Sequence, residues 1–384
     1  MRRVTRNTAG VLVLGLAAAA LLGGCSAREA VATAEPSAEA GGAKTLDEPI
    51  VVTDQRGVTH TFTEPIEKIA TTVIPAPSML TAIDQSYDRI VGINESTIKR
   101  DDGSVFATMF PGALTNTVIS GSDFVPNVET IAEIDPDVVI QWADQGDSDV
   151  YVSPIEDAGY PVIGLEYGTQ KDLEAWIEMF STLLGQEARG EELLERMHGT
   201  IADIEAFAAK QTHSPTTIFL RSAGDGGYNA GMSSTDAYMN TWMTMSGATN
   251  VAAGVEYQTA SATSIEQILE WDPEVIFTSA MSPLVPADIY ADPALAGLQA
   301  VQNKRIYAMP SGGFWWDPPS AESTLSFIWA TQVLYPETAS YDLRAEMVEL
   351  YEFLYGYTLT DDEIDDVLRF DINGQAANYD QFER

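Results

Sequence analysis

The sequence predicts an α/β protein with two lobes, each built on a parallel β-sheet, joined by long helices. Three observations lead to this prediction. Short apolar runs alternate with amphipathic segments, one fourteen-residue pattern occurs twice, and a proline-free stretch over 171–210 separates the two halves. Strands that alternate with helices are typical of a parallel sheet covered on both faces.

The first 24 residues have the pattern of an export signal. Three arginines precede an apolar stretch over 11–22, and small residues then lead to Cys25, the only cysteine of the chain. This order is typical of a signal peptide, and the apolar stretch is shorter than the ~20 residues that a membrane span needs. A signal that ends on cysteine resembles a bacterial lipobox, in which the sulfur of Cys25 is lipidated. An ordinary signal peptide or a membrane span is the alternative.

Composition restricts the possible partners. Without residues 1–24, the chain keeps 17 of its 20 basic residues and all 57 acidic ones, a net charge of −40. Such a surface repels nucleic acid and anionic headgroups, which excludes both as partners of the folded body. The chain has three histidines, of which His60 is far in sequence from His198 and His213. We therefore expect no multi-histidine metal site.

The N-terminal half is predicted to hold a tether and the first lobe. Residues 25–48 are rich in Ala, Glu, Ser and Gly, which indicates a flexible tether. The first lobe is predicted over 49–168 and opens with a hairpin of strands at 50–54 and 59–63. Further strands are expected at 69–74, 89–93, 138–141 and 162–165. Helices are expected at 78–83, from about 127, and at 153–158, with a polar loop before residue 127.

The second half is predicted to hold the linking helices and the second lobe. Linking helices are expected over 169–212, with a break at Gly185 and a second helix of about 24 residues, ~36 Å long at ~1.5 Å per residue. The second lobe is predicted over 213–384 and includes a helical C-terminal extension. Its strands are expected at 217–220, 275–278 and 305–308, and its helices at 236–246, 265–270, 320–334 and 361–368.

A repeat supports the two-lobe prediction. The pattern over 127–140 recurs over 264–277 with six of fourteen positions identical. Asn127 and Ser264 are suited to cap a helix, Asp-Pro ends it, and a buried strand follows. The succession of helix, turn and strand is common to all α/β proteins and explains these features, but it does not explain the matching Glu129 and Glu266. We interpret the two copies as two Rossmann-like lobes of similar topology, with a ligand cleft between them.

The combination resembles class III substrate-binding lipoproteins of ABC importers, which take up ferric siderophores, vitamin B12, haem and related complexes. The resemblance rests on the lipobox, the repeat, the long helices between the halves, and segments 303–307 and 315–320. It covers about residues 50–340. It implies an extracytoplasmic protein held at the cell membrane by a lipid anchor. It also implies that Glu129 and Glu266 meet arginines on the two subunits of an ABC permease dimer.

Candidate ligand-binding residues lie in loops that follow the predicted strands, where open α/β sheets place ligands. Aromatic side chains there would form walls for a bulky complex, and basic ones would neutralise an anionic chelate. A core position is the alternative for Trp142, and surface solvation is the alternative for Lys99 and Arg100. The candidates are Trp142, Tyr228, Phe314, Trp315, Trp316, Asp317, Lys99, Arg100 and Arg221.

The predicted function is therefore the capture of an Fe(III) chelate, a ferric siderophore, and its delivery to an importer. Cobalamin or haem is the alternative ligand in the same role. Signatures of hydrolases, metalloproteases and phosphate loops are missing from the sequence, so no catalytic residue and no intrinsic cofactor or metal is predicted. A secreted hydrolase on the same frame, with Asp123 and Asp317 as an acid pair, is the alternative from another class.

Overall fold

The computed structural model describes residues 46, 48–144, 146–257 and 262–384. Residues 44–384 form one compact unit. The predicted signal peptide, Cys25 and all but the end of the predicted tether lie outside the described residues. Within the described residues, no helix is long and apolar enough to cross a membrane.

The N-terminal lobe is built on a five-stranded parallel sheet in the order β5-β4-β3-β6-β7. Its central strands are fully buried because helices cover both faces. A separate antiparallel hairpin, β1 (Ile50–Thr53) and β2 (Thr59–Phe62), precedes the sheet as predicted. The sheet strands are β3 (Ile69–Thr71), β4 (Ile90–Asn94), β5 (Thr117–Ser120), β6 (Val138–Trp142) and β7 (Val162–Leu165).

The helices of this lobe include a region that the sequence analysis predicted as a polar loop, and that prediction is wrong. Asn94 caps the first of these helices by accepting a hydrogen bond from the Ser96 amide at 2.7 Å, and Phe106 in the second is fully buried. The lobe's helices are α1 (Ala76–Asp84), α2 (Glu95–Asp101), α3 (Val105–Met109), the 3-10 helix η1 (Pro111–Leu114), α4 (Val128–Ile134), α5 (Ser148–Tyr151) and α6 (Ser153–Asp157).

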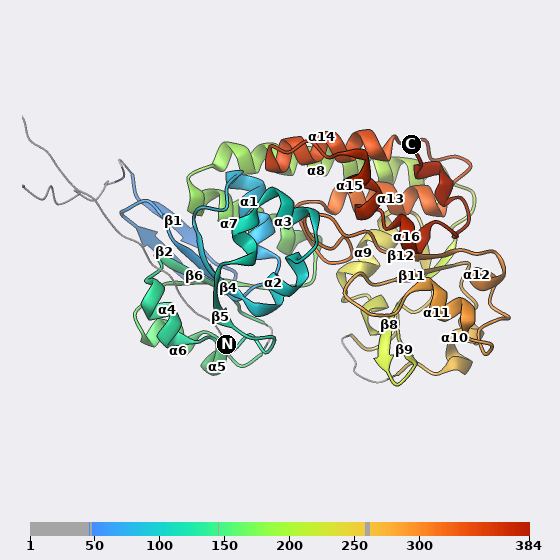
Figure 1. Ribbon diagram of the computed structural model, residues 1–384, viewed down its shortest axis with the longest axis horizontal. Coiled ribbons are helices and arrows are strands. Elements are labelled where there is room, and N and C mark those ends of the chain that lie inside the picture. The colour runs from blue at the N-terminus through green and yellow to red at the C-terminus, as the bar shows by residue number, and fades with distance from the viewer. Residues whose placement is uncertain (1–45, 47, 145, 258–261) are drawn as a thin grey trace, which may run out of the picture. The chain divides into compact units, whose positions relative to one another are not determined.

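Two long helices, α7 (Gln170–Leu184) and α8 (Glu187–Ala208), connect the lobes. The predicted break lies at Gly185, which ends α7 in the left-handed conformation at φ 67°. Glycine adopts this conformation without the cost of a Cβ contact. Helix α8 packs on α7 and, further along, on helices of the C-terminal lobe (Figure 1).

The C-terminal lobe repeats the parallel arrangement with the order β10-β8-β11-β12. Strand β8 also pairs with β9 in an antiparallel hairpin. The strands are β8 (Thr216–Gly224), β9 (Gly227–Asn229), β10 (Thr249–Asn250), β11 (Val275–Thr278) and β12 (Ile306–Ala308). The helices are η2 (Gly231–Ser233), α9 (Tyr238–Met245), α10 (Ile265–Trp271), α11 (Pro286–Ala291), α12 (Gln299–Gln302) and α13 (Ser323–Leu334).

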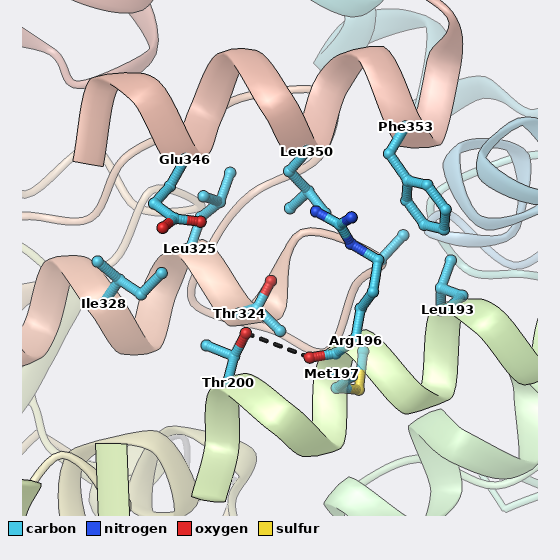
Figure 2. Close-up of a pocket in the computed structure, with 11 residues that line it drawn as sticks. Leu193, Arg196, Met197, Thr200, Thr324, Leu325, Ile328, Glu346, Leu350 and Phe353 are labelled. Atoms are coloured by element: carbon cyan, nitrogen blue, oxygen red, sulfur yellow. Dashed lines mark hydrogen bonds between the residues drawn. The ribbon is translucent and has the colours of Figure 1, made fainter. Parts of the chain in front are cut away.

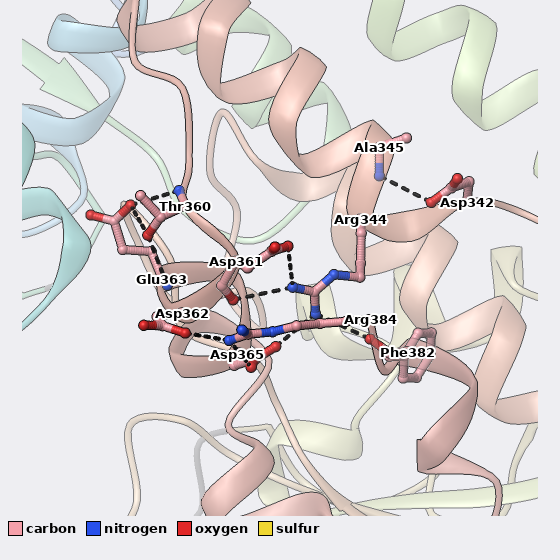
Figure 3. A network of polar contacts seen from close by, with 10 residues as sticks. All are labelled: Asp342, Arg344, Ala345, Thr360, Asp361, Asp362, Glu363, Asp365, Phe382 and Arg384. Atoms are coloured by element: carbon pink, nitrogen blue, oxygen red, sulfur yellow. Dashed lines mark hydrogen bonds and ion pairs between the residues drawn. The ribbon is translucent and has the colours of Figure 1, made fainter.

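The C-terminal extension is helical and packs against both lobes. Helix α14 (Leu343–Tyr355) contacts α1 and α13 and lies alongside α8 (Figure 1). Helix α15 (Asp361–Val367), α16 (Phe370–Asn373) and the 3-10 helix η3 (Tyr379–Phe382) follow it. Figure 3 shows how two arginines tie these pieces together: Arg344 binds Asp361 and Asp365, and Arg384 binds Asp365 and Asp362.

A small crevice lies where α8, α13 and α14 meet (Figure 2). It encloses about 30 Å³, roughly the volume of one water molecule. Leu193 and Met197 of α8 face Leu325 of α13 and Leu350 of α14 across it. Its small size identifies it as a packing gap between helices.

Candidate functional site

The candidate site is a pocket of about 370 Å³ between the two lobes. It lies at the edge where the strands of both parallel sheets end, which is where open α/β sheets place ligands. The N-terminal lobe contributes Ile74, Pro75, Phe124, Trp142 and Tyr167. The C-terminal lobe contributes Arg221, Met232, Met281, Phe314, Trp315 and Pro318.

Aromatic rings form the wall of the pocket on the N-terminal side. Trp142 is the last residue of β6, and its ring meets that of Tyr167 edge-on at 5.8 Å between centroids. Trp176 of α7 supports both rings from behind, and its indole N–H donates to Gln55 Oε1 and to the Glu166 carbonyl, both at 3.0 Å. Burial raises the pKa of Tyr167, so this side of the pocket is aromatic and uncharged.

Arg221 is the one charged side chain among the eleven residues that line the pocket. It lies in β8, opposite Asn229 of β9, and is partly exposed. Within the described part of the chain, its guanidinium group has neither a hydrogen bond nor an ion pair. The pocket therefore presents one cation that is available to an anionic ligand.

The aromatic wall on the C-terminal side comes from the loop after β12. We call residues Ser311–Trp316 the aromatic loop. Phe314 and Trp315 line the pocket with their rings 5.3 Å apart, and Ser311 pairs with Trp315 across the base of the loop. Pro318, directly after the loop, completes this side.

Comparison with known proteins identifies the family. The family model described as periplasmic binding protein matches residues 81–312. The chain belongs to this family. Its members are class III solute-binding proteins of ABC importers, so the chain is an extracytoplasmic substrate-binding protein and not an enzyme. This finding overturns the hydrolase alternative.

Curated relatives and solved structures agree with the family. The chain is 25% identical over 296 residues to the molybdate-binding protein MolA of Haemophilus influenzae, covering 70% of this chain and 80% of MolA. It is 23% identical to the iron(3+)-hydroxamate-binding protein FhuD of Bacillus subtilis, covering 63% of this chain and 76% of FhuD. A periplasmic solute binding protein of Veillonella parvula matches with a TM-score of 0.74 and 29% identity, covering 85% of this chain and 99% of that one. Helicobacter pylori CeuE with Ni(II) bound matches with a TM-score of 0.67 and 21% identity, covering 83% of this chain and 99% of that one.

Four of the nine predicted ligand-binding residues line the pocket of this periplasmic binding protein: Trp142, Arg221, Phe314 and Trp315. Trp142 is 8% exposed, so it belongs to both the core and the pocket wall. Trp316 and Asp317 follow in sequence but are fully buried behind the wall. The Trp316 indole donates to Glu322 Oε2 at 2.8 Å, and Asp317 Oδ2 accepts from Ser279 Oγ at 2.5 Å. We expected both at the cleft, and the structure places them beneath it.

The other three predicted residues do not line the pocket. Arg100 is buried in an ion pair with its neighbour Asp101, because its guanidinium turns toward Gly312 instead of solvent. Lys99 is 64% exposed and pairs with Glu95 at 2.9 Å on the surface of α2. Tyr228 lines a different hollow on the C-terminal lobe, because the β8–β9 hairpin directs its hydroxyl to Asp292 at 2.9 Å. Asp123 lies in the loop after β5, and neither Asp123 nor Asp317 lines the pocket.

Sequence reasoning missed Tyr167 as a lining residue. A signal was present, since Tyr167 follows strand β7 by two residues and therefore lies at the same edge of the sheet as Trp142. Met232 and Met281 complete the apolar lining from the C-terminal lobe.

Proposed function

We propose that this substrate-binding protein captures an Fe(III) chelate, a ferric siderophore, between its lobes and delivers it to an ABC permease. The observation that carries the proposal is the lining of the pocket, aromatic and apolar on both sides with one unpaired cation at Arg221. A siderophore supplies all the ligands of its iron, so the protein needs to supply only an aromatic and apolar surface and a few charged groups. A bare oxyanion such as molybdate carries two negative charges and would meet only one of opposite sign on this lining.

A haem ligand has less support than a chelate. None of the three histidines lines the pocket: His60 lies in β2, His198 pairs with Glu174 at 3.1 Å, and His213 pairs with Glu274 at 2.9 Å. Tyr167 could offer an oxygen to iron, but burial raises its pKa and disfavours the phenolate. Cobalamin remains an alternative ligand in the same transport role. The siderophore is supported by the name of one relative, the iron(3+)-hydroxamate-binding protein FhuD.

A titration tests the proposal. Purified protein is titrated separately with two ferric chelates, the cationic hydroxamate ferric desferrioxamine B and an anionic ferric catecholate, and with molybdate, cobalamin and haemin. Tryptophan fluorescence is recorded in each titration. We expect saturable quenching by a ferric chelate, since Trp142 and Trp315 would lie against it. Arg221→Ala should weaken binding of an anionic chelate by about 1.5–3 kcal/mol, the range for a hydrogen bond to a charged group.

Lys99→Ala is the matched control, because it also removes one cation but from an exposed position outside the pocket. It should leave the affinity unchanged. Saturable binding of molybdate with no response to either ferric chelate would contradict the proposal, as would a haemin complex with a Soret band that survives chelators.

Two further proposals concern how the protein is held and where it docks. We propose that Cys25 carries the lipid anchor, which mass spectrometry of the mature N-terminus would detect as a diacylglycerol adduct. Glu129 and Glu266 are proposed to dock on the two permease subunits. Both are exposed and lie in the first turns of α4 and α10, at matching positions of the two lobes. A pseudo-symmetric pair suits a two-fold partner.

A further inference from the structure

The aromatic loop has little support from regular secondary structure. Its internal backbone hydrogen bond runs from the Gly312 amide to the Phe314 carbonyl at 2.8 Å. The Ser311 amide donates to Val367 of α15 at 2.9 Å, so the first residue of the loop is already tied to the C-terminal extension. The position of Phe314 and Trp315 therefore depends on contacts from outside the loop.

A buried carboxylate behind the loop gathers three of these contacts. Glu322 is fully buried, and Trp316 of the loop donates to its Oε2 at 2.8 Å. Tyr351 and Tyr355 of α14 donate their hydroxyls to Oε2 and Oε1, each at 2.8 Å. The Tyr351 hydroxyl also accepts from the Gly313 amide at 2.8 Å, so one tyrosine holds both the loop backbone and the carboxylate.

The loop lies flat against these groups, and its two glycines make this possible. A Cβ at Gly312 would collide with the Tyr351 hydroxyl and with Glu322, and a Cβ at Gly313 would collide with Glu322 and come too close to the Tyr355 hydroxyl. Close approach of backbone to side chain is thus a requirement of the contact.

The same network reaches the N-terminal lobe. Arg100 donates to the Gly312 carbonyl at 2.9 Å and lies over the Phe314 ring at 4.9 Å. Phe106 and Phe110 of the N-terminal lobe meet the Tyr355 ring edge-on at 6.4 and 6.1 Å. The loop is therefore held between one lobe and the extension.

Helix α14 is itself fixed to the linking helices and the N-terminal lobe. Arg189 of α8 lies over the Phe353 ring at 3.7 Å, and Gln85 donates to the Phe353 carbonyl at 3.0 Å. Arg196 of α8 pairs with Glu349 at 2.7 Å (Figure 2 shows Arg196 beside Phe353). A well-anchored helix can hold the loop in a defined position.

We propose that α14 positions the aromatic wall of the ligand pocket, and that Tyr351, Tyr355 and Glu322 are positioning residues for Phe314 and Trp315. The proposal builds on the proposed function of the pocket. Its physical basis is that a buried carboxylate needs all of its donors. Removing either tyrosine hydroxyl leaves Glu322 under-paired, and removing that of Tyr351 also frees the Gly313 amide, so the loop loses its fixed position.

The test compares the full-length chain with a Tyr351→Phe, Tyr355→Phe variant. Tyr357→Phe is the matched control, because Tyr357 lies just beyond α14 and its hydroxyl binds Glu363 at 2.7 Å, away from the loop. The first readout needs no ligand: hydrogen exchange of the loop amides and the ¹⁹F signal of 5-fluorotryptophan at position 315, assigned with Trp315→Phe. The second is the affinity for the anionic ferric catecholate chelate used in the titration.

We expect the loop amides of the double variant to exchange at least about tenfold faster and the Trp315 signal to shift or broaden. Affinity for the chelate should fall about three- to tenfold, the effect of up to one lost hydrogen bond. Tyr357→Phe should match the natural chain in both. If the double variant does not fold, Tyr351→Phe alone is used, since it retains the Tyr355 contact.

Unchanged exchange and an unchanged Trp315 signal in the variants would overturn the proposal, whatever ligand binds. An altered loop with unaltered chelate affinity would also overturn it. If the natural chain binds no ferric chelate, the proposed function fails, and the ligand-free readouts decide the positioning role separately.

Discussion

The N-terminal and C-terminal lobes begin their repeated unit in the same way. Asn127 accepts a hydrogen bond from the Thr130 amide at 3.2 Å, and Ser264 accepts one from the Gln267 amide at 3.1 Å. The helices that follow end on an aspartate in the left-handed conformation, Asp135 at φ 48° and Asp272 at φ 36°. Each capping contact satisfies an amide that the helix leaves unpaired.

The residue after Asp-Pro has the same role in both lobes. Asp137 accepts hydrogen bonds from the Glu67 and Lys68 amides, just before β3. Glu274 accepts one from the Thr216 amide, the first residue of β8. In each lobe this carboxylate ties the start of one strand to the start of its neighbour.

The lobes differ where their strands end. Strand β3 stops at Thr71, whereas β8 runs on to Gly224 and turns into β9, and this longer strand carries Arg221. The C-terminal lobe also supplies the aromatic loop that the extension braces. The comparison teaches that the repeated unit builds the scaffold, and the parts that depart from the repeat supply the cation and the C-terminal aromatic wall of the site.

The largest expected effect tests whether the symmetry of the lobes serves docking. A Glu129→Ala, Glu266→Ala double variant should bind the chelate normally but lose most uptake by cells that lack the native copy. Loss of rim charges changes association with a partner more than it changes the fold. Uptake of ⁵⁵Fe supplied as the anionic ferric catecholate chelate measures the effect.

Glu133→Ala, Glu270→Ala is the matched control, because these two glutamates occupy equivalent exposed positions later in the same two helices. Uptake by the control should be near normal. If uptake by the Glu129, Glu266 variant is undiminished, the matching glutamates serve only the helix dipoles, worth ~0.3–1 kcal/mol each.

A medium effect concerns two carboxylates, one in each lobe, that are buried near the pocket loops. Burial raises the pKa of both: Asp101 is paired with Arg100, and the pKa of Asp317 rises to about 6, with Ser279 as its hydrogen-bond donor. Because the pKa of Asp317 is higher in the folded chain than in the unfolded chain, ionisation of Asp317 destabilises the fold. The stability contributed by its protonated form is therefore present at low pH and is lost as the pH rises through about 6. Asp317→Asn removes it.

Urea unfolding of the Asp317→Asn variant and the natural chain at pH 4 to 7 measures this effect. Between pH 4 and pH 7, the free energy of unfolding of the variant should rise by about 1–3 kcal/mol relative to that of the natural chain. A difference that stays constant with pH would show that Asp317 does not titrate in this range.

The smallest expected effect tests the repeat itself. Asn127→Ala and Ser264→Ala should each lower the free energy of unfolding by about 1 kcal/mol, the usual value of a helix cap. Because the two caps are in different lobes, the double variant should show the sum. Thermal and urea unfolding measure these free energies. A large effect of one substitution alone would show that the two capping residues are not equivalent.

Patterns with a local physical cause were predictable from the sequence. The break at Gly185, the two capping residues and the alternation of strands and helices follow from backbone and burial rules that act over a few residues. Phe314 and Trp315 were predicted because they lie in a loop that follows a predicted strand, where open α/β sheets place ligands.

Features that depend on contacts distant in sequence were not predictable in the same way. Nothing local to Arg100 shows that its guanidinium reaches Gly312, which is 212 residues away. Trp316 is buried because its indole donates to Glu322, which two tyrosines of α14 also bind. Tyr228 lies away from the pocket because its hydroxyl donates to Asp292. These partners become neighbours only when the sheets are assembled.

Gly312 and Gly313 also restrict how this protein can change its ligand. Since any side chain at either position would strike the hydroxyls and the carboxylate behind it, both positions must stay glycine while Glu322, Tyr351 and Tyr355 are present. Positions 312 and 313 can therefore change only together with Glu322 and α14. Transfer of this pocket wall to another substrate-binding protein would require residues 311–316, Glu322 and α14 to be transferred together.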